Sequence, residues 1–253
     1  ISMSRWVVVG VIGCLTLYAF VNTWWLEVKT IGVPAPVDMK IVQLSDIHRG
    51  SVSENHLRRL VQKTNALNPD LVLITGDLLD PAGRLSDESI APLNDLTIPA
   101  YWITGNHERY AGLEKVMTML KQTPVVPLRN EAAEFGGIQL IGIDDSEDRQ
   151  QVERILPSIS IDPNTFTILM YHQPEGYKAA ANAGVDLMLC GHTHNGQIWP
   201  FDWIVRSRFE YLKGLHTIDG MKLYISTGSG TWGPPMRLGS RNQITLIHLK
   251  KND

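Results

Sequence analysis

The chain has 253 residues, a length that suits one large α/β domain better than two small ones. An apolar content of 43%, a charged content of 19% and a formal net charge of −3 are typical of globular proteins and argue against a general nucleic-acid binder. The two cysteines, Cys14 and Cys190, lie far apart in sequence, so neither a disulfide framework nor a thiolate zinc site is predicted.

The first predicted element is an apolar helix over residues 6–26. This uncharged run of about 21 residues is long enough, as a helix, to cross the hydrocarbon of a bilayer. Arg5 precedes it, and Trp24 and Trp25 close it as an interfacial aromatic belt would. We therefore predict a single-pass N-terminal membrane anchor over residues 1–30. The side of the membrane on which the rest of the chain lies stays open.

Three other interpretations of this helix stay open. A cleaved secretory signal has a similar apolar run, although no small-x-small cleavage site follows it here. The stretch Val11–Cys14 resembles a lipoprotein box, but the apolar run continues past the cysteine. A soluble domain can also bury an apolar helix in its core.

The rest of the chain, residues 31–253, is predicted to alternate strands with helices. Residues 27–38 contain Pro34 and Pro36 with little periodicity, which indicates a linker or an edge segment. Short apolar runs then predict strands over 39–44, 71–74, 100–103, 166–171, 185–189, 222–226 and 243–249, and a strand pair over 132–135 and 138–143. Helices are predicted between 53 and 67, over 112–121 and over 175–183.

Polar residues follow five of these strands, at the point where each strand ends. Side chains two residues apart in an extended segment point the same way. The pair Asp46 and His48, and the pair His192 and His194, can therefore each point into one cavity. Strand ends of an α/β sheet converge on one edge, where ligands bind. With the other strand-end residues, seven oxygen and imidazole groups are predicted to meet there: Asp46, His48, Asp77, Asn106, His172, His192 and His194.

Such a mixed donor set suits zinc, manganese or iron, whereas magnesium alone would favour fewer imidazoles. Two divalent cations against the two carboxylates leave an excess of about two positive charges, and a bridging hydroxide would still leave about one. A centre that is so poorly neutralised attracts an anion. This favours phosphoryl chemistry over oxygen activation, because redox di-iron sites use more carboxylates.

As a set, these residues resemble the motifs of the calcineurin-like metallophosphoesterase superfamily. The resemblance covers roughly residues 39–250 and is specific as a set, although each motif alone is weak. Segments 191–197, 226–230 and 235–239 are further similar to membrane-associated bacterial phosphodiesterases, a subfamily that includes UDP-2,3-diacylglucosamine pyrophosphatases. The motifs are Asp46-Ile47-His48, Gly76-Asp77, Gly105-Asn106-His107-Glu108, the lone His172 and Gly191-His192-Thr193-His194.

The resemblance implies an α/β fold, a layered sandwich of two mixed β-sheets flanked by helices, in three or four layers, behind the N-terminal apolar helix. It implies a first metal on Asp46, His48 and His194, a second on Asn106, His172 and His192, and Asp77 as the bridge. The two divalent metal ions, Mn, Zn or Fe, would hold a bridging hydroxide that attacks phosphorus in line. His107 would be the acid, and the catalytic residues would be His107, Asp77 and Asn106.

The sequence also predicts roles for other residues, most of them near the motifs. The family often has an aspartate at the position of Glu108. This difference concerns a residue that would contact the metal ligands, and it leaves the ligand set itself unchanged. Gly76, Gly105 and Gly191 are expected to let the backbone turn sharply beneath the metals. Arg49 is expected to meet either a phosphate or a surface carboxylate. Histidines 56, 216 and 248 are interpreted as structural, and Asp70, Asp80, Asp144 and Asp145 as caps or solvated loop residues.

One segment, residues 198–212, is both aromatic and basic and follows a predicted ligand directly. As a loop it would suit a membrane interface or a pocket for an acylated, phosphorylated ligand. The alternative is ordinary burial, with Trp199 and Trp203 capping the end of the sheet.

The sequence therefore predicts a dimetal phosphohydrolase that cleaves a phosphodiester or pyrophosphate bond of a small-molecule or lipid-linked substrate, such as a UDP-acyl-sugar, at a membrane. The alternatives are a phosphomonoesterase acting on phosphoproteins or nucleotides, and a non-catalytic metal-binding membrane scaffold. No nucleic-acid partner is expected, and the oligomeric state is not predicted.

Overall fold

The central strands are apolar on both faces, and this explains why the domain is layered. The computed structural model describes residues 2–81 and 85–251. In strand β2, Met39–Leu44, Ile41 points into a core between two sheets, whereas Val42 points to the opposite face. Successive side chains alternate in this way along a strand, so a strand that is covered on both faces is apolar throughout.

Two six-stranded mixed sheets lie face to face. The first has the order β1-β12-β2-β3-β4-β5, in which β12 runs antiparallel to β2 and the other neighbours are parallel. The second has the order β10-β11-β9-β8-β7-β6, with antiparallel pairs at its two edges. The strands are β1 Leu26–Pro34, β3 Leu71–Thr75, β4 Ala100–Ile103, β5 Val125–Pro127, β6 Glu131–Phe135, β7 Ile138–Gly142, β8 Phe166–Met170, β9 Leu187–Cys190, β10 Gly214–Ile218, β11 Met221–Ile225 and β12 Asn242–Lys250.

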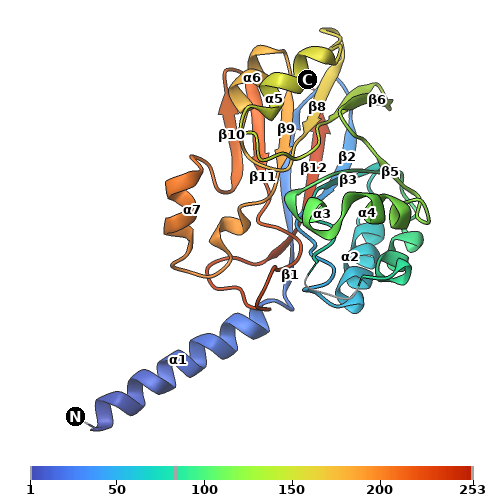
Figure 1. Cartoon of the computed structure of the whole chain (residues 1–253). Coiled ribbons are helices and arrows are strands. Elements are labelled where there is room, and N and C mark those ends of the chain that lie inside the picture. The colour runs from blue at the N-terminus through green and yellow to red at the C-terminus, as the bar shows by residue number, and fades with distance from the viewer. Residues whose placement is uncertain (1, 82–84, 252–253) are drawn as a thin grey trace.

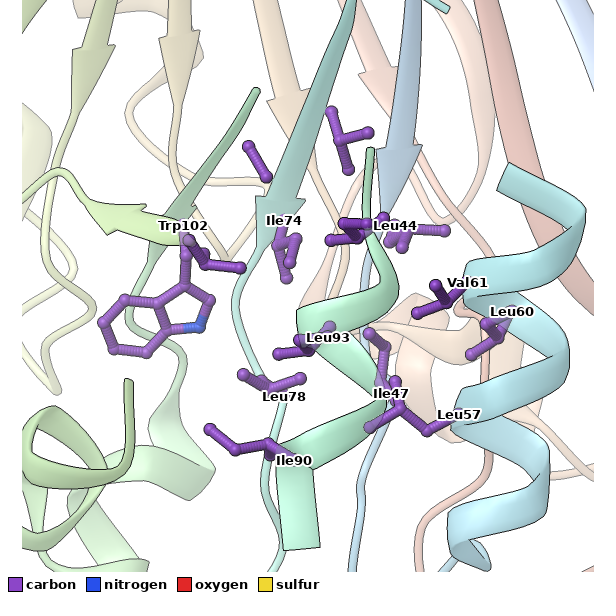
Figure 2. Close-up of a cluster of buried hydrophobic side chains, with 14 of the residues drawn as sticks. Leu44, Ile47, Leu57, Leu60, Val61, Ile74, Leu78, Ile90, Leu93 and Trp102 are labelled. Atoms are coloured by element: carbon purple, nitrogen blue, oxygen red, sulfur yellow. The ribbon is translucent and has the colours of Figure 1, made fainter. Parts of the chain in front are cut away.

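Helices cover the outer face of each sheet, which makes four layers (Figure 1). Leu57 and Leu60 of α2 belong to the same buried cluster as the strand residues Ile74 and Trp102, which Figure 2 shows. Val152 and Ala180 contribute to the core over the second sheet. The helices are α2 Glu54–Ala66, η1 Asp87–Asp95, α3 Asn106–Ala111, α4 Leu113–Leu120, α5 Gln151–Ile155, η2 Leu156–Ser158, α6 Tyr177–Asn182, η3 His194–Gly196 and α7 Asp202–Arg208.

The predicted layered α/β sandwich is thus confirmed. Ser53 caps α2 by accepting a hydrogen bond from the backbone of His56, as expected of a serine before an apolar stripe. The segment 27–38, for which a linker or an edge was predicted, begins with the edge strand β1, which pairs with β12. Most elements that were not predicted are short or exposed, namely α3, α5, α7, β5, β10, η2 and η3, whereas η1 has nine residues and buries Ile90 and Leu93.

Helix α1, Ser2–Asn22, projects from the domain as a separate rod (Figure 1). It is long and apolar enough to cross a membrane over Ser4–Asn22, and only 6% of its apolar window is buried. A signal sequence would satisfy the same test of length and composition. Its last turn is fixed to the domain, because the Arg237 amide donates to the Ala19 carbonyl oxygen and the Asn22 side chain donates to two carbonyls of the same loop.

Candidate metal centre

Five strand ends deliver the predicted residues to one place between the two sheets. Asp46 and His48 follow β2, Asp77 follows β3, and Asn106 opens α3 after β4. From the second sheet, His172 follows β8, and His192 and His194 follow β9. The seven predicted ligands therefore come from both sheets, three strands of one and two of the other, and they do not share the edge of a single sheet.

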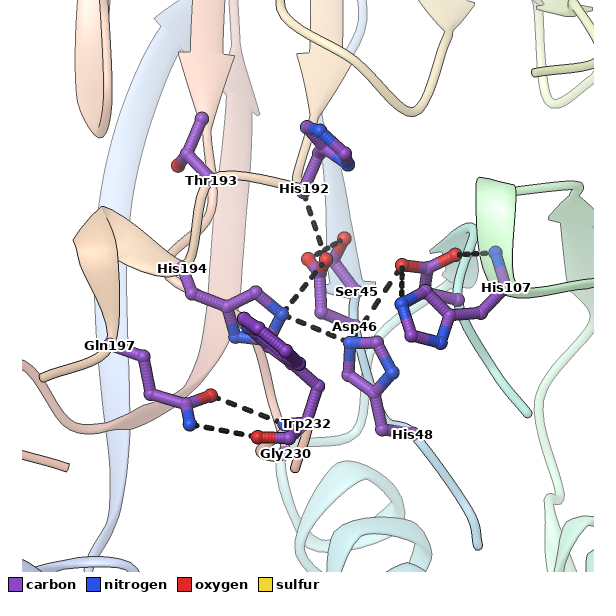
Figure 3. A network of polar contacts seen from close by, with 12 residues as sticks. Ser45, Asp46, His48, His107, His192, Thr193, His194, Gln197, Gly230 and Trp232 are labelled. Carbon is purple, nitrogen blue, oxygen red and sulfur yellow. Dashed lines mark hydrogen bonds and ion pairs between the residues drawn. The ribbon is translucent and has the colours of Figure 1, made fainter. Parts of the chain in front are cut away.

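The first group consists of Asp46, His48 and His194, whose possible ligand atoms lie within 4.8 Å of one another. The Nε2 atoms of His48 and His194 are 2.9 Å apart, and His194 Nε2 is 3.4 Å from Asp46 Oδ1. All three side chains are buried, and Figure 3 shows them pointing toward one another.

The second group consists of Asp77, His172 and His192. His172 Nε2 lies 3.2 Å from both Asp77 Oδ2 and His192 Nδ1. The same Asp77 oxygen is 3.7 Å from His48 Nε2, so this carboxylate stands between the two groups, where the bridge was expected.

The donor atoms of this centre fit a pair of divalent cations. Asn106 Oδ1 is buried and has no hydrogen-bond partner, although buried polar atoms normally have one. His172 Nδ1 lies 2.8 Å from the Thr75 carbonyl oxygen, which holds the ring and leaves Nε2 facing the centre. Imidazole with carboxylate and amide oxygen is a donor set for zinc, manganese or iron, as the sequence predicted.

Electrostatics in the metal-free protein also favour cation binding. Burial opposes the charge of Asp77, but the nearby His172, His48 and His107 together outweigh it and hold the pKa of Asp77 well below its usual value. Burial lowers the pKa of His192 to about 3 and that of His194 well below its usual value. Both rings are therefore neutral at neutral pH, the form in which histidine binds a metal.

The backbone is strained at the predicted ligands. Five of the seven have a positive φ that residues other than glycine rarely adopt: Asp46, His48, Asp77, His192 and His194.

The three glycines near the ligands were expected to let the backbone turn sharply. This was correct only for Gly76, with φ +87°. Gly105 and Gly191 have ordinary φ, but a Cβ at either would collide with the side chain of Asp77 or of Ser45 and Asp46. Their role is to leave room for the carboxylates.

His107 faces the cavity beside the two groups. Its Nε2 is 4.0 Å from Asp77 Oδ2, and its ring meets that of His48 edge to face. Asp80 was predicted to be a cap or a solvated loop residue, and this was wrong: its carboxylate is buried, 3.7 Å from His107 Nδ1 and 3.5 Å from His48 Nδ1. Although burial lowers the pKa of His107, Asp80 and Asp77 raise it above its usual value. Asp80 thus favours the protonated form of His107.

Glu108 connects the loops that follow β3 and β4. Its buried carboxylate accepts hydrogen bonds from the backbone N–H groups of Asp77, Leu79 and Gly105 at 2.9, 3.0 and 2.7 Å. The side chain thereby fixes the bridging aspartate relative to the start of α3. Burial, followed by the charge of Asp77, raises the pKa of Glu108 to about 7.

We expect Glu108→Ala to lower the free energy of unfolding by about 3 kcal/mol or more, because three buried N–H groups would lose their acceptor. Metal affinity should fall roughly 10- to 100-fold, as is usual when a group that orients ligands is lost. Urea denaturation and a manganese titration measure the two effects. Glu88→Ala, at an exposed position, is the matched control. Equal stability of the two variants would contradict this role for Glu108.

Arg237 is buried beside the centre, and it was not predicted from the sequence as a residue of the site. Its guanidinium donates to the carbonyl oxygens of Thr227 and Gly230 at 2.7 Å and lies 3.1 Å from His194 Nδ1. Burial lowers its pKa to about 9. Because its amide also holds Ala19, Arg237 joins helix α1 to a predicted metal ligand.

Segment 198–212 forms one wall of the cavity over the centre. The cavity measures about 330 Å³ and is lined by His107 and His192 together with Ile204, Arg208 and Phe209. A neighbouring apolar cavity of about 430 Å³ is lined by Trp199, Phe201, Ile204 and Trp232, among others. The segment contains helix α7, and Trp199 and Trp203 are both exposed, so the prediction that they cap the sheet by burial was wrong.

Other expectations had mixed outcomes. Arg49 donates to the carbonyl oxygens of Ser89 and Val52 and so ties the loop after β2 to η1, and it has no ion pair with a carboxylate among residues 2–81 and 85–251. Asp145 is buried and binds Arg109 and Gln173, so it is not a solvated loop residue. Burial of this kind depends on contacts between distant segments, which local turn signals do not report.

The chain is similar to proteins of one family throughout its folded part. Residues 39–196 match the profile of the calcineurin-like phosphoesterase family. A Campylobacter jejuni protein named as an uncharacterized metallophosphoesterase is 37% identical over 95% of this chain and 68% of its own length. A cattle protein named as a transmembrane protein with a metallophosphoesterase domain is 33% identical over 96% of this chain. This chain spans 60% of the cattle relative.

Solved structures show the same fold. A dimetal phosphatase from Danio rerio superimposes with a TM-score of 0.50 at 12% identity, covering 83% of this chain and 92% of that one. A Thermus thermophilus protein gives a TM-score of 0.50 at 10% identity, covering 77% of this chain and 92% of its own. At such low identity the likeness concerns the arrangement of the two sheets and their helices.

Proposed function

Since the chain belongs to the calcineurin-like phosphoesterase family, we propose that it hydrolyses a phosphodiester or pyrophosphate bond in an amphipathic, membrane-associated substrate such as a UDP-acyl-sugar. The observation that carries the proposal is the position of Asp77, whose carboxylate lies between two groups of buried histidines at one end of an open cavity. Two divalent cations, of Mn, Zn or Fe, would supply Lewis acidity and an activated water molecule.

The chain's own residues have distinct parts in this proposal. Asp46, His48 and His194 would hold one cation and Asn106, His172 and His192 the other, with Asp77 shared. His107, whose protonated form Asp80 favours, stands at the cavity wall, where it would donate a proton to the departing oxygen. Two carboxylates against two cations leave the site positive, which favours a phosphate group there.

The proposed substrate class rests on the wall that α7 provides. Ile204 and Phe201 line both the cavity over the centre and the neighbouring apolar cavity, so an apolar surface continues outward from the reacting groups. Arg208 lines the first cavity, beside the ring of Phe209. A phosphate at the metals with an acyl chain along this wall would satisfy both surfaces.

We also propose that α1 anchors the protein in a membrane, with an anchor over residues 1–30 and a catalytic domain over 31–253. The exposed apolar side chains of the helix, from Trp6 to Val21, and those of Trp24 and Trp25 just after it support this, because such a surface is unfavourable in water. An anchored enzyme would meet lipid-linked substrates at the membrane surface.

A pair of substrates tests the function. We expect kcat/KM to be higher for an acylated UDP-sugar pyrophosphate than for a soluble aryl phosphodiester or a phosphomonoester. The double variant Phe201→Ser/Ile204→Ser should lower kcat/KM for the acylated substrate roughly 10- to 100-fold, because apolar contact is lost, and change it about twofold or less for the aryl diester. Val126→Ser, an exposed change on β5, is the control. Preference for a soluble substrate, or an equal loss on both, would contradict the proposed class.

A further inference from the structure

A second cavity lies where α1 meets the domain. It measures about 500 Å³ and is lined by Tyr18 and Asn22 of α1, Lys29 of β1, Lys213 before β10, and Arg241 before β12. It shares no lining residue with the cavity over the metal centre. Its floor includes the buried Tyr224, whose hydroxyl accepts a hydrogen bond from Gln243.

This cavity is positively charged in a chain whose net charge is negative. Lys29, Lys213 and Arg241 line it together with one acid, Glu27, so three positive charges and one negative leave +2, against −3 for the whole chain. Within the described ranges 2–81 and 85–251, none of these three cations has a carboxylate oxygen within 4.0 Å. Cations grouped around a cavity without acidic partners repel one another and favour an anion among them.

The segment that leads from α1 into β1 is held in a fixed position beside this cavity. The side chains of Arg59 and Lys63, both on α2, donate to the carbonyl oxygens of Trp24 and Leu26. The Arg241 guanidinium lies over the Trp25 ring, 4.9 Å from its centre. Tryptophans at the end of a membrane helix lie at the depth of the lipid headgroups. The cations that follow the helix would therefore lie at that depth.

We propose that this cavity binds the phosphate-bearing headgroup of an anionic phospholipid. The three cations would contact the phosphate, and Tyr18, exposed on the side of α1, would lie along the start of the acyl chains. The proposal rests on the membrane anchoring proposed above, but it is independent of the reaction at the metals. It gives the domain a fixed orientation relative to the membrane surface, which one flexible tether would not.

The test uses the full chain in mild detergent, with dioctanoyl phosphatidylglycerol and dioctanoyl phosphatidylcholine titrated and counted by native mass spectrometry. We expect one tightly held phosphatidylglycerol and no comparable site for phosphatidylcholine. The variant Lys29→Gln/Lys213→Gln/Arg241→Gln should bind phosphatidylglycerol about a hundredfold more weakly, since each cation near a headgroup strengthens binding roughly fivefold. The variant Lys29→Arg/Lys213→Arg keeps both charges and should retain binding. The control Lys115→Gln/Lys121→Gln/Lys178→Gln should also retain binding. Its three positions are exposed and lie on α4, just after α4, and on α6.

Each outcome decides one point. Equal phosphatidylglycerol binding by the wild type and the first variant would overturn the site, and circular dichroism of the variants excludes misfolding as the cause of a loss. Equally tight binding of soluble glycerol phosphate would support the anion site and overturn the lipid as its source. Flotation of the wild type with phosphatidylcholine vesicles tests the anchor alone, so failure of the anchor and failure of the headgroup site are distinguished.

Discussion

Asp77→Asn is expected to lower kcat at least roughly a thousandfold and to reduce the bound metal from two ions per chain toward one or none. The variant keeps the size of the side chain but removes the charge that stands 3.2 Å from His172 and 3.7 Å from His48. It would leave Asp46 as the only ligand carboxylate of the proposed set, against cations carrying four positive charges. Hydrolysis of an aryl phosphodiester with added manganese, and elemental analysis of the dialysed protein, measure the two effects.

Asp70→Asn is the matched control, because Asp70 is exposed and accepts a hydrogen bond from the Lys40 amide, which asparagine can also accept. It should retain activity within about twofold. An Asp77→Asn protein that keeps two metals and wild-type turnover would contradict the shared position assigned to this carboxylate.

His107→Gln is expected to lower kcat roughly 10²- to 10⁴-fold while leaving metal content unchanged, because His107 is proposed as a proton donor and not as a ligand. The loss should depend on the substrate. A nitrophenolate leaves without protonation, so the variant should lose little with that leaving group and most with an alkyl or sugar leaving group. A series of diesters with leaving groups of rising pKa measures this dependence.

His248→Gln, on β12 and outside both groups of possible metal ligands, is the control for exchanging a histidine. A uniform loss across the leaving-group series, accompanied by loss of metal, would instead indicate that His107 is a ligand. A ring nitrogen of His107 is close enough to a ring nitrogen of His48 and a carboxylate oxygen of Asp77 for this outcome to be informative.

The strands around the centre could be predicted from the sequence because they are buried on both faces. Runs such as Leu71–Thr75 and Ala100–Ile103 are apolar and end abruptly at polar residues, which marks both the strand and the loop after it. The convergence of the seven groups followed from the same pattern, since strand ends place consecutive loops together. Their division between two sheets was not predicted, because the spacing of the motifs does not report which sheet each strand joins.

What could not be predicted depends on contacts between distant segments. Helix α7 has seven residues and none of them is buried, so no apolar stripe marks it. Asp80 and Arg237 are buried polar residues whose partners lie elsewhere in the chain or on strained loops, and their immediate neighbours in sequence look like ordinary turns. The reason given for Gly105 and Gly191 was wrong because a collision with a side chain from another strand leaves no local signal.

The hydrogen bond between the Arg237 amide and the Ala19 carbonyl has a practical consequence for biochemistry on this protein. Expressing only the portion after α1, a common way to obtain soluble material, would release a loop whose arginine touches His194. Rate constants obtained from such shortened material would describe an altered centre. Enzymology is therefore better done on the chain with its helix in place.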